Sequence, residues 1–151
     1  MTADPRLEKI TPANVDAACG LRLRPGQERF VASVSFSLAE AYAYGETAWP
    51  RVVADGDEVV GFVMAGFDPA HVVPQYRTYL WRLAIAADHQ GRGYGTFAVA
   101  AVVDEARRRG ERELWTSWVE GEGCPKPFYT RLGFRATGEV VEGEPVAVLA
   151  L

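Results

Sequence analysis

The chain has 151 residues, a formal net charge of −4 at pH 7, 48% hydrophobic residues and 24% charged residues. This length predicts a single domain over residues 1–151, and the composition excludes a disordered chain. The acidic balance argues against a nucleic-acid-binding surface and is compatible with cationic or small neutral partners.

Neither a membrane segment nor a leader is expected. No apolar run reaches the roughly 18–20 residues that a membrane-spanning helix requires. The segment MTADPRLEKI at the start is polar and acidic, and it lacks the basic and apolar regions of a secretory signal. We therefore expect a cytoplasmic protein without a membrane partner.

The cysteines and histidines predict no metal site. Cys19 and Cys124 do not form a disulfide framework, and together with His71 and His89 they lack the spacing of zinc ligands. We interpret both cysteines as buried or semi-buried thiols, as free cysteines often are. Neither histidine has an assignable role.

Turn residues and hydrophobic periodicity predict the elements of the N-terminal half. In chain order these are a strand at 6–10, a helix through Val15, Ala17 and Ala18, a helix at 37–44, and strands at 52–54 and 59–67. The segment Ser37-Leu38-Ala39-Glu40 has the pattern of a capping box, which predicts that a helix begins there, and Gly45 ends it. Asp55-Gly56-Asp57 predicts a hairpin turn between the two later strands.

The C-terminal half continues the alternation of strands and helices. A largely apolar run at Tyr79–Ala86 predicts a strand that is buried on both faces. The later elements are a helix from about Thr96 to Arg109, a strand at 114–119, a short helix at 125–132, and hairpin strands at 134–141 and 146–151. The order βααβββαβαββ predicts an α/β (α+β) protein with a mixed sheet and helices on its faces.

A glycine-rich loop, Gln90-Gly91-Arg92-Gly93-Tyr94-Gly95, joins a strand to the start of a helix. Glycines let the backbone turn with positive φ and approach a ligand closely, and the amides of the helix start suit a phosphate. Thr96 stands where a dinucleotide fingerprint has its third glycine, and no Lys-Ser/Thr pair follows, so neither a Rossmann site nor a P-loop is predicted. Arg107-Arg108-Arg109 lies roughly 20 Å away along the helix, and we interpret it as a solvated helix end.

Two motifs together resemble the GNAT N-acetyltransferase family. Gln90, Gly93 and Gly95 match the family pattern Gln/Arg-x-x-Gly-x-Gly/Ala, and the segment 128–134 (FYTRLGF) is similar to its late helix. The segments 36–44 (FSLAEAYAY), 81–82 (WR) and 133–139 resemble the bacterial spermine/spermidine (polyamine) branch. Gly121-Glu122 and Pro125 replace an Asn and an Ala of many members, which predicts fewer polar contacts to a pantetheine arm.

The resemblance implies the GNAT fold, with six to seven mostly antiparallel strands, and acetyl-CoA as co-substrate without a metal. It assigns cofactor binding to strand residues Leu83, Ala84 and Ile85 and to the loop residues Gln90, Gly91, Arg92, Gly93, Tyr94, Gly95 and Thr96. The strand backbone would pair with the pantetheine arm, and the Ile85 amide would face the thioester oxygen. The loop amides would hold the pyrophosphate.

For catalysis, the resemblance assigns the general acid to Tyr129, whose alternative role is packing at the core edge. The residues leave the base open among Glu120, Glu122, Asp88 and Glu40, and we choose Glu120, acting through water. Trp81 and Glu122 are the candidate substrate residues. Trp115 and Trp118 alternate with their neighbours on a strand and are expected in the core.

These inferences predict an N-acetyltransferase that moves acetyl from acetyl-CoA to a primary amine of a small molecule, with a polyamine as the finer prediction, by direct attack in a ternary complex. The alternatives are acetylation of a protein N-terminus or lysine, acetylation of an aminoglycoside, and a non-catalytic acyl-CoA-binding module. The identity of the amine and the formation of a homodimer are left open.

Overall fold

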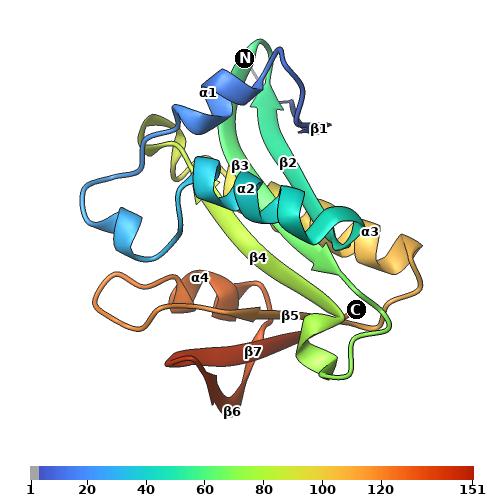
Figure 1. The fold of residues 1–151 in the computed structure, drawn as a ribbon. Coiled ribbons are helices and arrows are strands. Elements are labelled where there is room, and N and C mark those ends of the chain that lie inside the picture. Colours follow the sequence, from blue (N-terminus) through green and yellow to red (C-terminus); the bar gives the residue numbers. More distant parts are fainter. Residues whose placement is uncertain (1–3) are drawn as a thin grey trace.

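The computed structural model describes residues 4–151 and shows one mixed sheet of seven strands (Figure 1). The strands are β1 (Pro5–Lys9), β2 (Ala48–Asp55), β3 (Glu58–Phe67), β4 (Thr78–Ile85), β5 (Glu113–Ser117), β6 (Arg135–Val141) and β7 (Glu144–Ala150). They lie in the order β1-β2-β3-β4-β5-β7-β6, and every neighbouring pair is antiparallel except β4 and β5. The predicted fold class and element order are confirmed.

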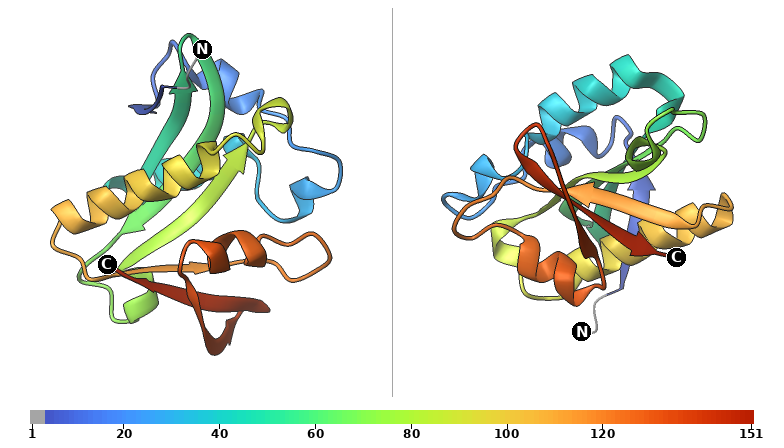
Figure 2. Two further views of the ribbon diagram at one scale, coloured as in Figure 1. Left: turned by 180° about the vertical axis from the view of Figure 1, so that it is seen from behind. Right: turned by 90° about the horizontal axis from the view of Figure 1, so that it is seen from below.

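Helices cover both faces of the sheet. They are α1 (Val15–Cys19), α2 (Val34–Tyr44), α3 (Tyr94–Arg108) and α4 (Lys126–Arg131), with short 3-10 turns at Gln27–Arg29, Gly45–Thr47, Pro74–Tyr76 and Ala87–His89. α2 crosses the face of the sheet that is toward the viewer in Figure 1, and α3 crosses the opposite face, seen from behind in Figure 2. Within residues 4–151, none of the helices has the length and apolar content needed to cross a membrane.

Side-chain alternation along β2 and β3 divides the core into two clusters. Val52, Phe62 and Met64 are buried against α1 and α2. Val53 and Val63 point the other way and are buried in the cluster that includes α3 and α4. Because successive residues of a strand face opposite sides of the sheet, both faces of these central strands are apolar and covered.

α2 begins at Val34, earlier than the sequence predicts. Its N-cap is Ser33, whose hydroxyl oxygen accepts a hydrogen bond from the Phe36 N–H at 3.1 Å. Ser37 is buried inside the helix, and its hydroxyl donates to the Ser33 carbonyl at 2.8 Å. The capping-box prediction was wrong, because Ser33 supplies the same capping chemistry earlier and Val34 packs into the core. Glu40 therefore has no capping role.

Two burial predictions also need correction. In β4 only Thr78, Leu80 and Ala84 are buried, because the other side chains of this strand border a cavity. Cys19 is exposed at the end of α1, where the short helix leaves it outside the core, while Cys124 is half-buried. Both cysteines are free thiols.

Candidate active site

β4 and β5 separate along their length and leave one edge of β4 open. These two parallel strands share one paired position, Tyr79 with Trp115, whereas β4 remains paired with β3 as far as Ile85. β5 stays against β7 over its whole length. A cavity of about 1120 Å³ lies along the open edge and is bordered by Leu80 to Ile85.

The open edge presents backbone groups of β4 to the cavity. The Ala86 N–H donates to the Val60 carbonyl of β3 at 2.9 Å. Backbone direction alternates along a strand, so Ala84, two residues earlier, also directs its N–H and C=O toward β3. The backbone groups of Leu83 and Ile85 therefore point to the cavity, while those of Ala84 face β3. An extended ligand that carries amides could pair with this edge as an additional strand.

Gln90 closes the far end of this edge. Its Nε2 donates to the Ile85 carbonyl at 2.9 Å and to Gln27 Oε1 at 2.7 Å. Gln27 Nε2 in turn donates to Gln90 Oε1 at 3.1 Å, which ties the 3-10 turn at Gln27–Arg29 to the end of β4. The side chain predicted to bind cofactor is thus occupied by structural hydrogen bonds, and its role is to hold the loop against the strand.

The glycine loop has the backbone conformation that its sequence predicts. Gly91 and Gly93 have φ of 77° and 89°, and no atom lies within 4 Å of a Cβ added to either residue. Glycine is therefore required at both positions because of the positive φ, and not because a side chain would lack space. Gly93 is the N-cap of α3, whose first amides have no partner within the helix. At Gly95 a Cβ would lie 3.3 Å from Phe128 Cζ, so the absent side chain lets α3 and α4 pack closely.

The other predicted loop residues contribute through the backbone. Tyr94 is buried, and its hydroxyl donates to Asp55 Oδ2 at the β2–β3 turn, away from the cavity. Arg92 and Thr96 are exposed. Of the residues assigned to cofactor binding, those that border the cavity are Leu83, Ala84, Ile85, Gln90 and Gly95.

Tyr129 on α4 borders the cavity beside the β4–β5 gap. It is buried, stacked on Trp118 with ring centroids 5.9 Å apart and edge-on to Phe134 at 5.4 Å. Burial raises the pKa of the Tyr129 phenol to about 12, and the neighbouring Thr116 hydroxyl opposes this rise. Tyr129 is therefore a fixed, protonated donor at neutral pH.

The structure does not bring the predicted carboxylates to Tyr129. Glu120 and Glu122 are exposed in the loop after β5, and neither borders the cavity. Glu40 does border it, half-buried and paired with Arg82 at 2.6 Å. This pair was missed because Glu40 and Arg82 are distant in sequence. Among residues 4–151, no group of three or more His, Cys, Asp or Glu side chains is placed to hold a metal ion.

Aromatic side chains border the end of the cavity nearest the start of β4. Trp81, predicted to contact substrate, lies 5.1 Å from Tyr44 of α2 and 5.5 Å from Tyr79, measured between ring centroids. Trp115 is half-buried at the same cavity, and Trp118 is buried. Sequence analysis did not predict that Tyr44 and Tyr79 meet Trp81 here, because Tyr44 lies on α2 and the other two lie on β4.

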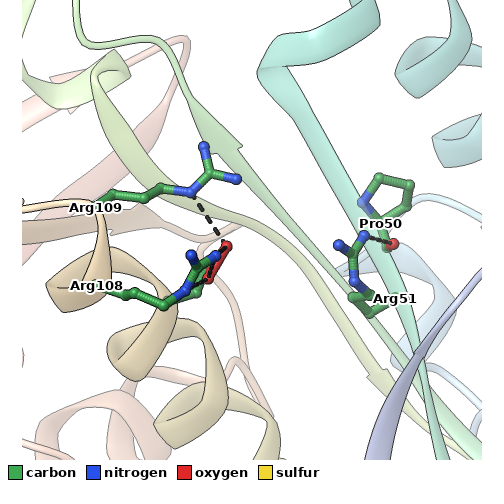
Figure 3. A network of polar contacts seen from close by, with 5 residues as sticks. Pro50, Arg51, Arg108 and Arg109 are labelled. Carbon is green, nitrogen blue, oxygen red and sulfur yellow. Dashed lines mark hydrogen bonds and ion pairs between the residues drawn. The ribbon is translucent and has the colours of Figure 1, made fainter.

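The arginine triplet is confirmed as a helix end remote from the glycine loop. Arg108 and Arg109 both pair with Glu105 on α3, Arg109 through Nε at 3.3 Å (Figure 3). Arg109 also lies over the Phe67 ring at 4.0 Å from its centroid. Nearby, Arg51 donates to the Pro50 carbonyl at 2.8 Å, and burial lowers its pKa. The exposed triplet thus ends the helix, with Arg108 and Arg109 paired to Glu105, and does not act as a phosphate clamp.

Comparison with known proteins identifies the class to which this fold and site belong. The sequence profile described as the acetyltransferase (GNAT) family matches residues 22–134, which is most of the chain. The chain therefore belongs to the acetyltransferase (GNAT) family. This match defines the family and does not single out a polyamine branch.

Individual relatives agree with this assignment. Over 58 residues the chain is 45% identical to an uncharacterized N-acetyltransferase of Methanocaldococcus jannaschii, a match that covers 37% of this chain and 24% of that protein. The chain thus spans about a quarter of this curated relative's length. A domain from M. jannaschii has a TM-score of 0.76 at 15% identity, covering 99% of this chain and 100% of that one. A Bacillus subtilis acetyltransferase in complex with CoA has a TM-score of 0.70 at 16% identity, covering 99% of both chains. These structures share the fold.

Proposed function

We propose that this protein transfers an acetyl group from acetyl-CoA to a primary amine of a small molecule. The observation that carries the proposal is the open edge of β4, which presents the backbone of Leu83 and Ile85 to a cavity that also contains Tyr129. A pantetheine arm is an extended chain with amide groups, and this edge is an unpaired strand. Family membership and the CoA complex of the B. subtilis structure support the same ligand.

The positive-φ glycine loop supplies the second half of the CoA site. The loop leads into the first turn of α3, whose amides have no partner within the helix and where the helix dipole favours negative charge. These amides would donate hydrogen bonds to the pyrophosphate. The side chains of Gln90 and Tyr94 do not take part, because both are engaged elsewhere.

Acetyl transfer then proceeds by direct attack in a ternary complex. An N–H of the open β4 edge, at Leu83 or Ile85, donates to the thioester oxygen and stabilises the negative charge that develops there. The amine forms a bond to the carbonyl carbon while the carbon–sulfur bond breaks. Tyr129 donates its proton to the departing sulfur, water takes a proton from the amine, and this proton returns to the Tyr129 phenolate so that the acid is regenerated.

For Glu120 we propose only the indirect role, through water, that the sequence analysis gives it. Its carboxylate is exposed and outside the cavity, so it would accept the amine proton only through water. We expect Glu120→Gln to lower kcat by less than about tenfold, since a direct general base contributes about 10²–10⁴-fold. Steady-state kinetics at several pH values would measure this, and a loss of about 10³-fold would show that Glu120 acts directly.

The acceptor that we propose is a cationic amine, with a polyamine as the finer proposal. Carboxylates that border the cavity outnumber arginines by five to three; they are Glu28, Glu40, Asp68, Glu142 and Glu144, against Arg29, Arg82 and Arg131. We therefore expect the KM for a polyamine to rise with ionic strength, because salt screens the attraction. A KM that is independent of salt between low and physiological ionic strength would contradict the cationic acceptor.

The test of the function is CoA release from acetyl-CoA with a panel of amines, together with mass analysis to identify which amine gains acetyl. The panel includes polyamines, an aminoglycoside, a lysine peptide and a peptide with a free N-terminus. Activity confined to the peptides or to the aminoglycoside would contradict the proposed acceptor and identify that compound's class as the acceptor. Binding of acetyl-CoA without turnover on any amine would indicate a non-catalytic acyl-CoA-binding module.

A further inference from the structure

A continuous series of aromatic rings borders the end of the cavity nearest the start of β4. Tyr44 of α2 lies edge-on to Trp81 with ring centroids 5.1 Å apart, Trp81 lies 5.5 Å from Tyr79, and Tyr79 lies 5.9 Å from Tyr76. His71 continues the series at 5.2 Å from Tyr76. All of these side chains border the cavity, and we call Tyr44, Trp81, Tyr79 and Tyr76 the aromatic series.

The fold makes specific room for the central ring of this series. Tyr79 is paired with Gly66 of β3, and a Cβ built on Gly66 would stand 2.3 Å from Tyr79 Cζ. No side chain can occupy that space, so the glycine lets the phenol ring lie flat across the neighbouring strand. The register of β3 and β4 shifts between Met64 and Ala65, so Trp81 has no partner on β3. This β-bulge changes the direction of the Trp81 side chain beside the open edge.

The charges around the aromatic series favour a cation. Arg82 lies 5.6 Å from the Trp81 ring and is neutralised by Glu40, so this pair adds no net charge. Asp68 also borders the cavity. Burial is the main cause that raises the pKa of Tyr79 to about 12, so its phenol remains neutral at pH 7. Aromatic faces with a nearby carboxylate bind organic ammonium groups.

We propose that the aromatic series binds a second, non-reacting ammonium group of the acceptor and so makes the enzyme select extended diamines over monoamines. This inference rests on the proposed function, which places the thioester at the open edge by Leu83 and Ile85. Trp81 and Tyr79 precede Leu83 by two and four residues, or about 7 and 13 Å along the strand. A diamine whose ends can span such a distance reaches both points, whereas a short diamine does not.

The experiment compares α,ω-diaminoalkanes of increasing length with primary monoamines of the same carbon number. We expect kcat/KM for long diamines to exceed that of the matched monoamine by about tenfold, a factor between those of an exposed and a desolvated cation–π contact. Tyr76→Leu and Asp68→Asn should remove most of this preference through KM while kcat is retained. Tyr42→Leu is the matched control, because Tyr42 is on α2 but 91% exposed and outside the cavity.

One further variant and one binding measurement test the aromatic series without relying on acetyl transfer alone. Gly66→Ala should displace the Tyr79 ring and weaken the diamine preference, with thermal melting to check that the fold survives. A bis-quaternary ammonium alkane cannot be acetylated, and calorimetry measures its binding directly. We expect Tyr76→Leu to weaken that binding and Tyr42→Leu to leave it unchanged.

The outcomes distinguish the two proposals. Equal kcat/KM for matched diamines and monoamines in the wild type would overturn the aromatic subsite and leave the acetyltransferase function standing. Failure to acetylate any amine would overturn the proposed function, and the calorimetric comparison would still decide the subsite. Equal binding of the bis-quaternary alkane by wild type and Tyr76→Leu would overturn it.

Discussion

Tyr129→Phe is expected to lower kcat by about 10²–10⁴-fold, the usual contribution of a positioned general acid, while acetyl-CoA binding changes little. The substitution removes only the hydroxyl, so the packing against Trp118 and Phe134 is retained. Without this positioned donor, the sulfur leaves as a thiolate or takes its proton from a donor that is not held at the same place. The remaining rate reflects the thiol of CoA, whose pKa resembles that of cysteine, about 8.5, and which can leave unprotonated.

The pH dependence provides a second measurement on the same residue. Because burial raises the pKa of Tyr129 to about 12, the phenol stays protonated from pH 6 to 10 and the acid should not be lost in that range. Tyr129→Ala serves as the contrast, since it also empties the core beside Trp118 and should cost about 3–5 kcal/mol of stability. Near-wild-type turnover in Tyr129→Phe, with destabilisation only in Tyr129→Ala, would reduce Tyr129 to a packing residue.

Gly93→Val is expected to abolish the stabilisation that acetyl-CoA gives to the fold. In the wild type, a ligand at 100 times its Kd should add about 2.7 kcal/mol to the free energy of unfolding. Gly93 has φ of 89°, a conformation that a β-branched residue does not adopt without strain. The loop amides would therefore turn away from the pyrophosphate position. Thermal melting with and without saturating acetyl-CoA measures the loss.

Gly110→Val is the matched control for this substitution. Gly110 has φ of 82° and lies just beyond the other end of α3, with no atom within 4 Å of an added Cβ. Both variants therefore carry a similar backbone strain, but only one of them lies in the glycine loop. We expect Gly110→Val to melt lower than the wild type and to keep the full acetyl-CoA shift. A full shift in Gly93→Val as well would remove the glycine loop from the cofactor site.

Local patterns in the sequence determined the order of elements and the conformation of the glycine loop. Turns, alternation and helical spacing act over a few residues, so the order βααβββαβαββ could be predicted before any contact was known. The positive φ of Gly91 and Gly93 is likewise local, because only glycine adopts it without strain. Tyr129 came from a motif; the structure places it beside the cavity, and its role as general acid stays a prediction.

Only the tertiary structure decided which side chains meet. α2 begins at Val34 and not at the predicted Ser37, because the Val34 side chain packs into the core, and a capping pattern carries no information about that contact. Gln90 is occupied by Gln27, 63 positions away, and Glu40 pairs with Arg82 across 42 positions. The aromatic series joins α2, β4 and the turn before it, and the open edge of β4 exists only because β5 diverges. These features depend on how separate elements pack, and packing between distant segments leaves no periodic signal in the sequence.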